Sequence, residues 1–581
     1  MVKEGVVEIV VYSEGTKVAD LFELSTLWTK VEVDSIGVAL LTFPAGDIAK
    51  QKVEESEKNT FDLGKEIKIE AVIGTTEKTV LFEGLVTRHS FEFVDGDGRL
   101  VVECKTFTYL LTLNVQSKSY YKKSIKEILS AVFSPYSKIT SKIDNISFKH
   151  NEVIQFYQSD WDFVLNRMQE SGLVLITNGK DVTIGKPKFK KSSLQELVLG
   201  NNVLEVSLEQ NSEQQFGAIK ASTWDITKQK VITEKSAPYT TPIAGTHTSK
   251  QISQKFSNPE LQYRRSTVQD KQLLKDWLEM QSLVAELSKM TGTVKIEGTT
   301  KAKLGEVIKL KGVSTRFEGD YFVGGIEHEF EDGIWNTTLS LGYSPKNAIS
   351  SSTSSNFEGL HIGKVKKIIE DPCEHDRILV DLPLLGAEKN EIWARLGTIS
   401  ASNSYGSLIV PDIGDEVIVG FFSEYGNDAV ILGSLYNTKN KMPGKVEAEN
   451  NKKGFFTKEK LSIEFNDEEK SILLSIKDGG KVVINDKDKL ITIKDVNENT
   501  ISLTEKSLTI ESKGDLIFKA EGLISFESGK DIDAKSGKDF KVKGTNIKMQ
   551  ADSVMEVKGG SKAELSASGN AVVKGALVKI N

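Results

Sequence analysis

Cysteine is scarce in this 581-residue chain, where Cys104 and Cys373 are the two copies. The sequence therefore offers neither a disulfide framework nor a cysteine-rich zinc site. It also lacks an apolar run long enough to span a bilayer. Its first residues lead into a short alternating strand and not into the apolar core of a signal peptide. We therefore expect the protein to be made and folded in the cytoplasm without a signal peptide.

An excess of basic charge is also missing. The chain has 82 acidic and 75 basic residues, with a formal net charge of −7. A general nucleic-acid binder needs a basic field to neutralise phosphates, so this class is disfavoured. With 39% hydrophobic and 27% charged residues, the composition is that of a folded protein, and its length suggests three or four domains.

The last fifth of the chain lacks several residue types altogether. Residues 460–581 contain no Pro, Trp, Tyr, Cys, His or Arg, and their 20 Lys are balanced by 20 Asp and Glu. An ordinary globular domain of this length would contain most of these types. This composition is typical of a repeat.

An apolar residue recurs every eight positions in this segment. Positions i and i+2 lie on one face of a strand, so each unit offers a two-residue apolar face between mostly polar neighbours. The same step continues from Met549 to Val573, and before residue 508 the spacing is nine or ten. The repeated residues are Leu508, Leu516, Ile524, Ile532 and Phe540, with partners two residues on at Ile510, Phe518, Phe526, Ala534 and Val542.

A period of eight is too short for helix pairs and indicates strands stacked along an axis. Two apolar side chains per unit cannot close a core within one chain, whereas identical chains wound about one axis can bury them. The repeat therefore predicts an intertwined homotrimeric β-helix, or β-prism, over residues 460–581. The apolar pairs, Ala534 excepted, would form the trimer core. A flat, long β-meander and a single-chain solenoid are the alternatives.

Upstream, residues 346–356 are Ser-rich and typical of a linker. Five short strands are predicted in residues 357–437, which suits a small closed barrel of the OB kind. The predicted strands cover residues 360–365, 377–382, 392–396, 416–422 and 429–435. The aromatic residues Phe421, Phe422 and Tyr425 alternate with acidic residues and not with cations, so nucleic-acid binding is not expected here either.

Specific motif residues accompany these strands, namely Trp393, Arg395, Gly414, Asp415, Gly420 and Gly433. This combination resembles the barrel of the VgrG family, the valine–glycine repeat spike proteins of type VI secretion systems. It equally resembles the spikes of extracellular contractile injection systems and of contractile phage tails. In these proteins a trimeric β-helix follows the barrel, which is the order found here. Val-Lys-Gly triplets at 542–544, 557–559 and 573–575 retain a weak valine–glycine character.

Residues 1–345 contain two strand-rich regions. The resemblance implies a hub of two β-barrel subdomains, about 1–175 and 176–345, so that three chains offer six similar surfaces to a hexameric tube. Helical spacing and end signals predict helices at 124–133, 159–172 and 270–290. Strands of the first barrel are predicted at 6–12, 31–41, 65–73, 80–89 and 100–105.

No enzyme is expected. The sequence contains no GxSxG, Walker-type or HExxH motif, and its six His residues are scattered. Cys373 and His375 supply two potential ligands where a zinc site needs four, which favours a surface loop. Some phage spikes carry a lysozyme domain after the barrel, but the connector here, residues 438–459, is too short for one. We expect no cofactor and no metal.

The resemblance implies a mainly β protein that acts as the homotrimeric spike of a contractile injection system. It would join the hexameric inner tube to a membrane-piercing needle, contact baseplate proteins and the target membrane, and be ejected towards a target cell. A PAAR-like tip protein, with or without an effector, would cover the strand edges at Val578, Ile580 and Asn581. The alternative is a phage-type tailspike with a polysaccharide-degrading or receptor-binding role, which the scarcity of aromatic residues in 460–581 disfavours.

Overall fold

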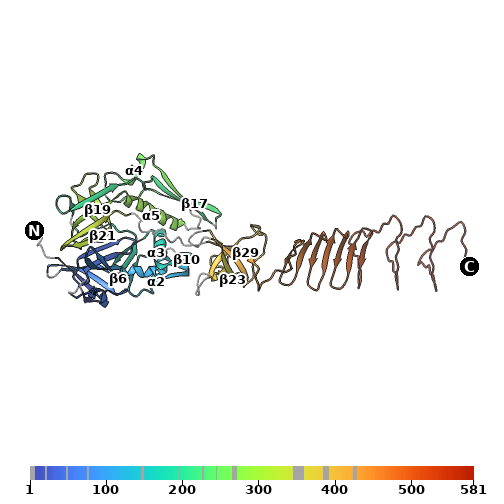
Figure 1. The fold of residues 1–581 in the computed structure, drawn as a ribbon. Helices are drawn as coiled ribbons and strands as arrows, with labels where there is room; N and C mark the ends of the chain where they lie inside the picture. Colours follow the sequence, from blue (N-terminus) through green and yellow to red (C-terminus); the bar gives the residue numbers. More distant parts are fainter. Residues whose placement is uncertain are drawn as a thin grey trace. The chain divides into compact units, whose positions relative to one another are not determined.

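The fold is known from a computed structural model and consists mainly of β-strands, as predicted (Figure 1). The chain divides into two compact units, Met1–Met442 and Pro443–Asn581, which are described separately. The structure describes residues 7–19, 22–47, 50–74, 77–145, 149–194, 196–225, 228–241, 243, 245–264, 271–343, 359–383, 391–422 and 428–580. The predicted linker, residues 346–356, lies outside these ranges.

A fourteen-stranded sheet forms the centre of the hub. Its main path has the order β15-β19-β22-β21-β3-β4-β7-β6-β5-β1-β2, and β13, β14 and β20 attach to it through β21. The strands are β1 (Val7–Ser13), β2 (Thr16–Lys17), β3 (Thr26–Glu32), β4 (Val38–Pro44), β5 (Glu66–Ile73), β6 (Glu77–Val94), β7 (Asp97–Lys105), β13 (Lys190–Lys191), β14 (Leu197–Val198), β15 (Glu205–Gln210), β19 (Met290–Glu297), β20 (Glu306–Lys311), β21 (Gly319–Glu331) and β22 (Ile334–Leu341).

Strands from both predicted hub subdomains belong to this one sheet. Strand β21 pairs antiparallel with β3, with Gly325 opposite Glu32 and Glu331 opposite Thr26. The predicted boundary near residue 175 falls within β11 (Val174–Asn178), which pairs with β12 (Asp181–Gly185), and β12 pairs with β9 (Thr140–Ile143). Alternation along the chain predicts strands but carries no information about their partners.

One of the predicted strands corresponds to two strands in the structure. The range 31–41 covers the end of β3, a turn and the start of β4. Asp34 adopts φ 57° in this turn, a conformation that reverses the chain and that Asp tolerates better than most residues. Apolar residues continue on both sides of the turn, which is why the sequence pattern does not reveal it.

The three predicted helices are present. They are α2 (Ile125–Phe133), α3 (Asp160–Glu170) and α5 (Lys271–Ser288). Ser124 and Glu127 form a capping box at the start of α2, and the Ser159 hydroxyl accepts the Asp162 N–H (3.0 Å) at the start of α3. Shorter helices are α1 (Glu54–Glu57), η1 (Asn59–Phe61), η2 (Phe107–Thr112) and α4 (Ser249–Lys255).

Besides the small sheet of β11, β12 and β9, the described part of the hub contains two further small sheets. One pairs β8 (Val115–Ser124) with β10 (Lys149–Ser159), and β10 leads directly into α3. The other joins β16 (Ala218–Asp225) to β17 (Lys230–Ser236) and β18 (Glu260–Arg264), with Leu274 and Leu278 of α5 packed against Ile219 and Ala221.

The predicted OB barrel is confirmed. Its strands close in the order β23-β24-β25-β29-β28, and each matches a predicted strand to within two residues at either end. The bounds are β23 (His361–Lys367), β24 (Ile378–Asp381), β25 (Glu391–Leu396), β28 (Glu416–Phe421) and β29 (Ala429–Leu435), with a hairpin of β26 (Ala401–Ser402) and β27 (Tyr405–Gly406) between β25 and β28.

The C-terminal unit begins as an antiparallel meander, the row of arrows in Figure 1. Its first strand, β30, lies in the predicted connector 438–459, so the sheet starts earlier than predicted. Beyond Glu511 the described residues, 512–580, form no strand within the chain. The meander strands are β30 (Lys452–Phe456), β31 (Ser462–Asn466), β32 (Ser471–Ser475), β33 (Lys481–Asn485), β34 (Leu490–Lys494), β35 (Thr500–Leu503) and β36 (Leu508–Glu511).

A buried carboxyl links distant parts of the hub. Asp34 is 1% exposed, and it accepts the Leu175 N–H (2.6 Å) and the Tyr343 hydroxyl. Burial raises the pKa of Asp34 to about 6, although both hydrogen bonds act in the opposite direction. The folded hub therefore holds a proton at Asp34 between about pH 6 and pH 4, where the unfolded chain does not. The stability that this proton contributes is present at low pH and lost as pH rises through 6.

Replacing Asp34 with asparagine should stabilise the hub at pH 7.5 and have little effect near pH 4, because the neutral amide mimics the protonated carboxyl. We expect a difference on the order of 2 kcal/mol at the higher pH. Thermal unfolding followed by tryptophan fluorescence across this pH range measures it. Asp95→Asn, at an exposed turn position with φ 54°, is the matched control. A stability difference between Asp34→Asn and the native protein that does not change with pH would contradict the assignment.

Candidate interaction surfaces

The motif residues of the OB barrel mainly shape its turns and strands. Gly414 adopts φ 96° and donates its N–H to the Val365 carbonyl (2.8 Å), while the Asp415 carbonyl accepts the Val365 N–H (2.9 Å). The Asp415 carboxylate also accepts the Asp412 N–H (2.9 Å). This turn therefore joins the start of β28 to β23.

The remaining motif residues lie on the barrel strands. Trp393 is buried on β25, and Arg395 is exposed on the same strand. Gly420 is buried on β28, and Gly433 pairs with Ile418 beside a shift in the register of β28 and β29. These four residues lie on three strands, β25, β28 and β29.

The barrel packs on the β8–β10 pair of the hub. Ile154 and Phe156 of β10 are buried in the same apolar cluster as the barrel core. The Phe156 ring lies edge-on to His361 of β23, with ring centroids 5.3 Å apart. From β8, the hydroxyls of Ser119 (3.2 Å) and Tyr121 donate to the Glu391 carbonyl. We call this contact the hub–barrel joint.

An arginine connects the two sides of the joint. The guanidinium of Arg377 donates two bonds to Asp371, from Nη2 (2.8 Å) and Nε (3.0 Å), and its Nη1 lies 3.4 Å from Glu152 of β10. Glu152 also accepts the Trp393 N–H (3.4 Å). Burial raises the pKa of Glu152 to about 7, and the charge of Arg377 opposes this shift.

Asp371 organises the loop that carries Cys373 and His375. Its carboxylate accepts the backbone N–H groups of Cys373 (3.0 Å), His375 (2.9 Å) and Arg377 (3.2 Å). Burial alone would raise the pKa of Asp371, but these bonds and the guanidinium hold it well below its usual range. Among the described residues, no three His, Cys, Asp or Glu side chains are grouped so that they could hold a metal.

The hub–barrel joint was not predicted from the sequence. Glu152 and Arg377 are 225 positions apart, and neither belongs to a recognisable motif. Ile154 and Phe156 resemble the core residues of any alternating strand. No local signal distinguishes them, because the contact arises only when the barrel is folded against the hub.

The meander carries a continuous apolar face. Ile463 pairs with Leu474, Leu474 with Val482, and Val482 with Ile493, so that one column crosses the strands. A second column runs beside it at a distance of two residues along each strand. We call the twelve residues of both columns the apolar stripe: Ile463, Phe465, Ile472, Leu474, Val482, Ile484, Ile491, Ile493, Ile501, Leu503, Leu508 and Ile510.

The stripe is exposed within one chain. Ile472 is 38% exposed, Ile493 is 45% exposed, and Leu508 at the last strand is 64% exposed. On the opposite face, the central column becomes polar along the meander, ending with Thr492, Ser502 and Thr509. The sheet therefore has one apolar and one largely polar face, which is the pattern of a layer that packs on another.

The predicted core residues of the eight-residue repeat are exposed as well. Phe518 and Phe526, eight positions apart, lie edge-on with ring centroids 6.3 Å apart, so these two residues are on the same side of the chain. Val578 and Ile580, predicted to dock a tip protein, are also exposed, and Asn581 lies outside the described residues. The other repeat residues are each more than 44% exposed: Leu516, Ile524, Ile532, Phe540 and Val542.

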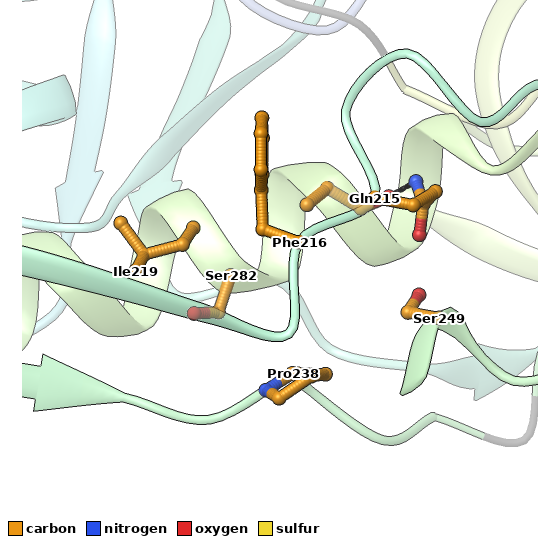
Figure 2. Close-up of a pocket in the computed structure, with 7 residues that line it drawn as sticks. Gln215, Phe216, Ile219, Pro238, Ser249 and Ser282 are labelled. Atoms are coloured by element: carbon orange, nitrogen blue, oxygen red, sulfur yellow. Dashed lines mark hydrogen bonds between the residues drawn. The ribbon is translucent and has the colours of Figure 1, made fainter. Parts of the chain in front are cut away.

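A small cavity lies between β16 and α5 in the hub (Figure 2). It has a volume of about 10 Å³ and is lined by Gln215, Ile219, Ser249 and Ser282, among others. Gln215 donates to the Ala285 carbonyl (2.7 Å), and its side-chain oxygen has no partner among the described residues. The volume suits one water and no organic ligand, so the cavity is not a substrate site.

None of the helices in the described part of the chain combines the length and the apolar character needed to cross a bilayer.

Comparison with protein families gives two matches. Residues 3–332, more than half of the chain, match the family described as the Alg8 N-terminal domain. Residues 361–436 match the type VI secretion system/phage-baseplate injector OB domain, which coincides with the closed barrel. No curated protein matches the sequence.

Solved structures share the fold at low sequence identity. A chain of the Francisella PdpA–VgrG complex in its half-lidded form is 11% identical, with a TM-score of 0.53 over 87% of this chain and 88% of that chain. A chain of the lidless PdpA–VgrG complex is also 11% identical, with a TM-score of 0.52 over 85% of this chain and 100% of that chain. The Escherichia coli c3393 protein, a type VI secretion component, is 13% identical with a TM-score of 0.47 over 73% of this chain and 99% of that chain.

Replacing Arg377 with alanine should loosen the hub–barrel joint. The change leaves Glu152 without its cationic partner and Asp371 without two hydrogen bonds, a loss of about 3 kcal/mol. With a protease site engineered into the predicted linker, size-exclusion chromatography after cleavage reports whether hub and barrel stay together. Arg395→Ala, exposed on the same barrel, should leave them together. Equal retention in both variants would show that the ion pairs do not hold the joint.

Proposed function

Because the chain belongs to the family of the Alg8 N-terminal domain and has the fold of VgrG-like central spike proteins, we propose that it is the homotrimeric spike and hub of a contractile injection system. The observation that carries this proposal is the order of parts in one chain. A mainly β hub and an injector-type OB barrel are followed by strands whose apolar face is left uncovered.

The trimer is supported by the apolar stripe and the repeat. A single sheet has no second layer to cover the stripe, and the described residues 512–580 have no strand partner in their own chain. Two further copies would supply both, because each presents an identical stripe and identical repeat strands. Closed threefold symmetry buries the apolar residues of all three copies about one axis.

The proposed action is mechanical and needs no catalysis. The hub would sit on the hexameric inner tube and on baseplate proteins, and force from the tube would pass through the hub–barrel joint into the needle. Buried Ile154 and Phe156, together with Arg377 between Asp371 and Glu152, suit a joint that must not bend. The needle would contact the target membrane only during ejection.

The far end of the repeat is proposed to carry a PAAR-like tip protein. Val578 is 48% exposed and Ile580 is 91% exposed. In a trimer, three copies of these two residues would place six apolar side chains in water, and proteins normally cover such groups. A tip protein, with or without an effector, would cover them.

Tube binding should reside in the first unit. The barrel packs on the hub, so the fragments should be divided at the unit boundary, after Met442. We expect the tube protein to be pulled down by residues 1–442 and by the full chain, and not by residues 443–581. Capture by the C-terminal fragment alone would overturn the proposed orientation.

Removing residues 572–581 should abolish capture of the tip protein and leave tube binding unchanged, because the deletion takes away Val578 and Ile580 but no part of the hub. Pull-down of a PAAR-like protein by the full and shortened spikes measures the difference. Substituting Lys574 with alanine provides a control within the same ten residues. If the shortened spike captures the tip protein at full affinity, the docking site lies elsewhere.

A further inference from the structure

We infer that the meander β30–β36 sets the register of the eight-residue repeat. The meander folds first within each chain and then docks its apolar stripe on the stripes of two further copies. Residues 512–580 gain their strand partners only after this docking. This inference rests on the proposed trimer and adds an order of assembly. It follows from a difference between two parts of the same unit, one paired within the chain and the other not.

The meander is complete within one chain. Each of its strands pairs with the next through four or five residues, from Lys452 opposite Asn466 to Thr500 opposite Glu511. Its turns use residues with positive φ, such as Lys470, Asp478 and Lys489, which reverse the chain tightly. The meander can therefore form before any contact with another copy.

The point where the chain leaves the meander is also fixed. The side-chain oxygen of Asn499 accepts the Lys513 N–H (2.8 Å) and the Ser512 hydroxyl (3.2 Å). Asn499 is itself held by Asp495, which accepts from both its backbone and its side-chain nitrogen (2.8 Å each). The first turn of the repeat is thereby attached to the last strands of the meander.

Beyond this point the turns are formed but the strands are not. Ser512 and Ser536 each donate a hydroxyl proton to a carbonyl three residues on, at 3.2 Å and 2.9 Å. Between these turns, the described residues 512–580 have no backbone ladder within the chain. An extended backbone needs such a ladder to be stable, so these strands must take their partners from other copies.

A repeat of equal units cannot choose its own register. If one chain slides by eight residues against the next, Leu516 takes the place of Ile524, and most apolar contacts within residues 508–542 are regained. The mispaired trimer would therefore lose little stability in this stretch. The register of the meander is better defined, because its neighbouring strands run in opposite directions. If the meander of one copy slid by one strand against that of the next copy, strands of opposite direction would lie beside each other.

Further copies of this chain are the binding partners that best fit the apolar stripe. The stripe is two residues wide and crosses six strands, and an identical stripe matches it in width, length and chemistry. The rest of the segment carries balanced charge, 20 Lys against 20 Asp and Glu, and so offers no field that would attract a charged partner. Copies docked through the stripe also bring the repeat segments together from the same starting point.

Two leucines on one strand provide a matched test. Leu474 belongs to the stripe, while its neighbour Leu473 lies on the opposite face of β32. In the full-length chain, Leu474→Asp should abolish the trimer and make amide exchange across residues 512–580 at least about 100-fold faster. Leu473→Asp should preserve both the trimer and the slow exchange. A third variant, Ile532→Asp, should keep the trimer and the protected meander while exchange rises only from about residue 532 onward.

Native mass spectrometry and hydrogen–deuterium exchange distinguish the possible outcomes. Loss of the trimer in Ile532→Asp to the same extent as in Leu474→Asp would overturn the proposed order, and so would slow exchange of residues 512–580 in Leu474→Asp. Equal loss in the two leucine variants would overturn the assignment of the stripe as the docking face. A native protein that is monomeric, with fast exchange throughout 512–580, would instead contradict the trimer of the proposed function.

Discussion

Each of the strands β31–β36 places two apolar side chains on one face of a single-layered sheet, and within one chain nothing covers that face. Covering a residue such as Ile472, now 38% exposed, is worth about 1 kcal/mol, so the twelve-residue stripe offers on the order of 10 kcal/mol per chain. Association costs a similar amount in lost motion. In the proposed trimer, the stripe would be sufficient to begin assembly, and the repeat that follows would supply the remaining free energy of association.

The first unit solves a different problem, which is how to attach a barrel rigidly to a hub. Strand β10 contributes Ile154 and Phe156 to the barrel's apolar core and Glu152 to the ion pair with Arg377, all within five residues. The apolar pair supplies burial, and the charged groups, held by Asp371 and by the Trp393 N–H, fix the orientation. Apolar burial and a fixed ion pair in one contact suit a protein whose proposed task is to push.

Local pattern predicted the local structure and could not predict its partners. The OB strands and helices α2, α3 and α5 were predictable because periodicity, caps and motif residues such as Gly414 are properties of short segments. The turn at Asp34, the pairing of β21 with β3, and the contact of Glu152 with Arg377 depend on residues far apart in sequence. For the repeat, the sequence predicted a two-residue apolar face on stacked strands, and within one chain the described residues 512–580 form no strand.

The central claim is that copies of the same chain cover the apolar stripe and the repeat. The mass of the purified full-length protein in solution, measured by light scattering over a range of concentrations, tests it most directly. We expect three times the chain mass of 64.1 kDa, about 192 kDa, with no dissociation on dilution. A stable species at the mass of one chain, with the stripe left in water, would contradict the account.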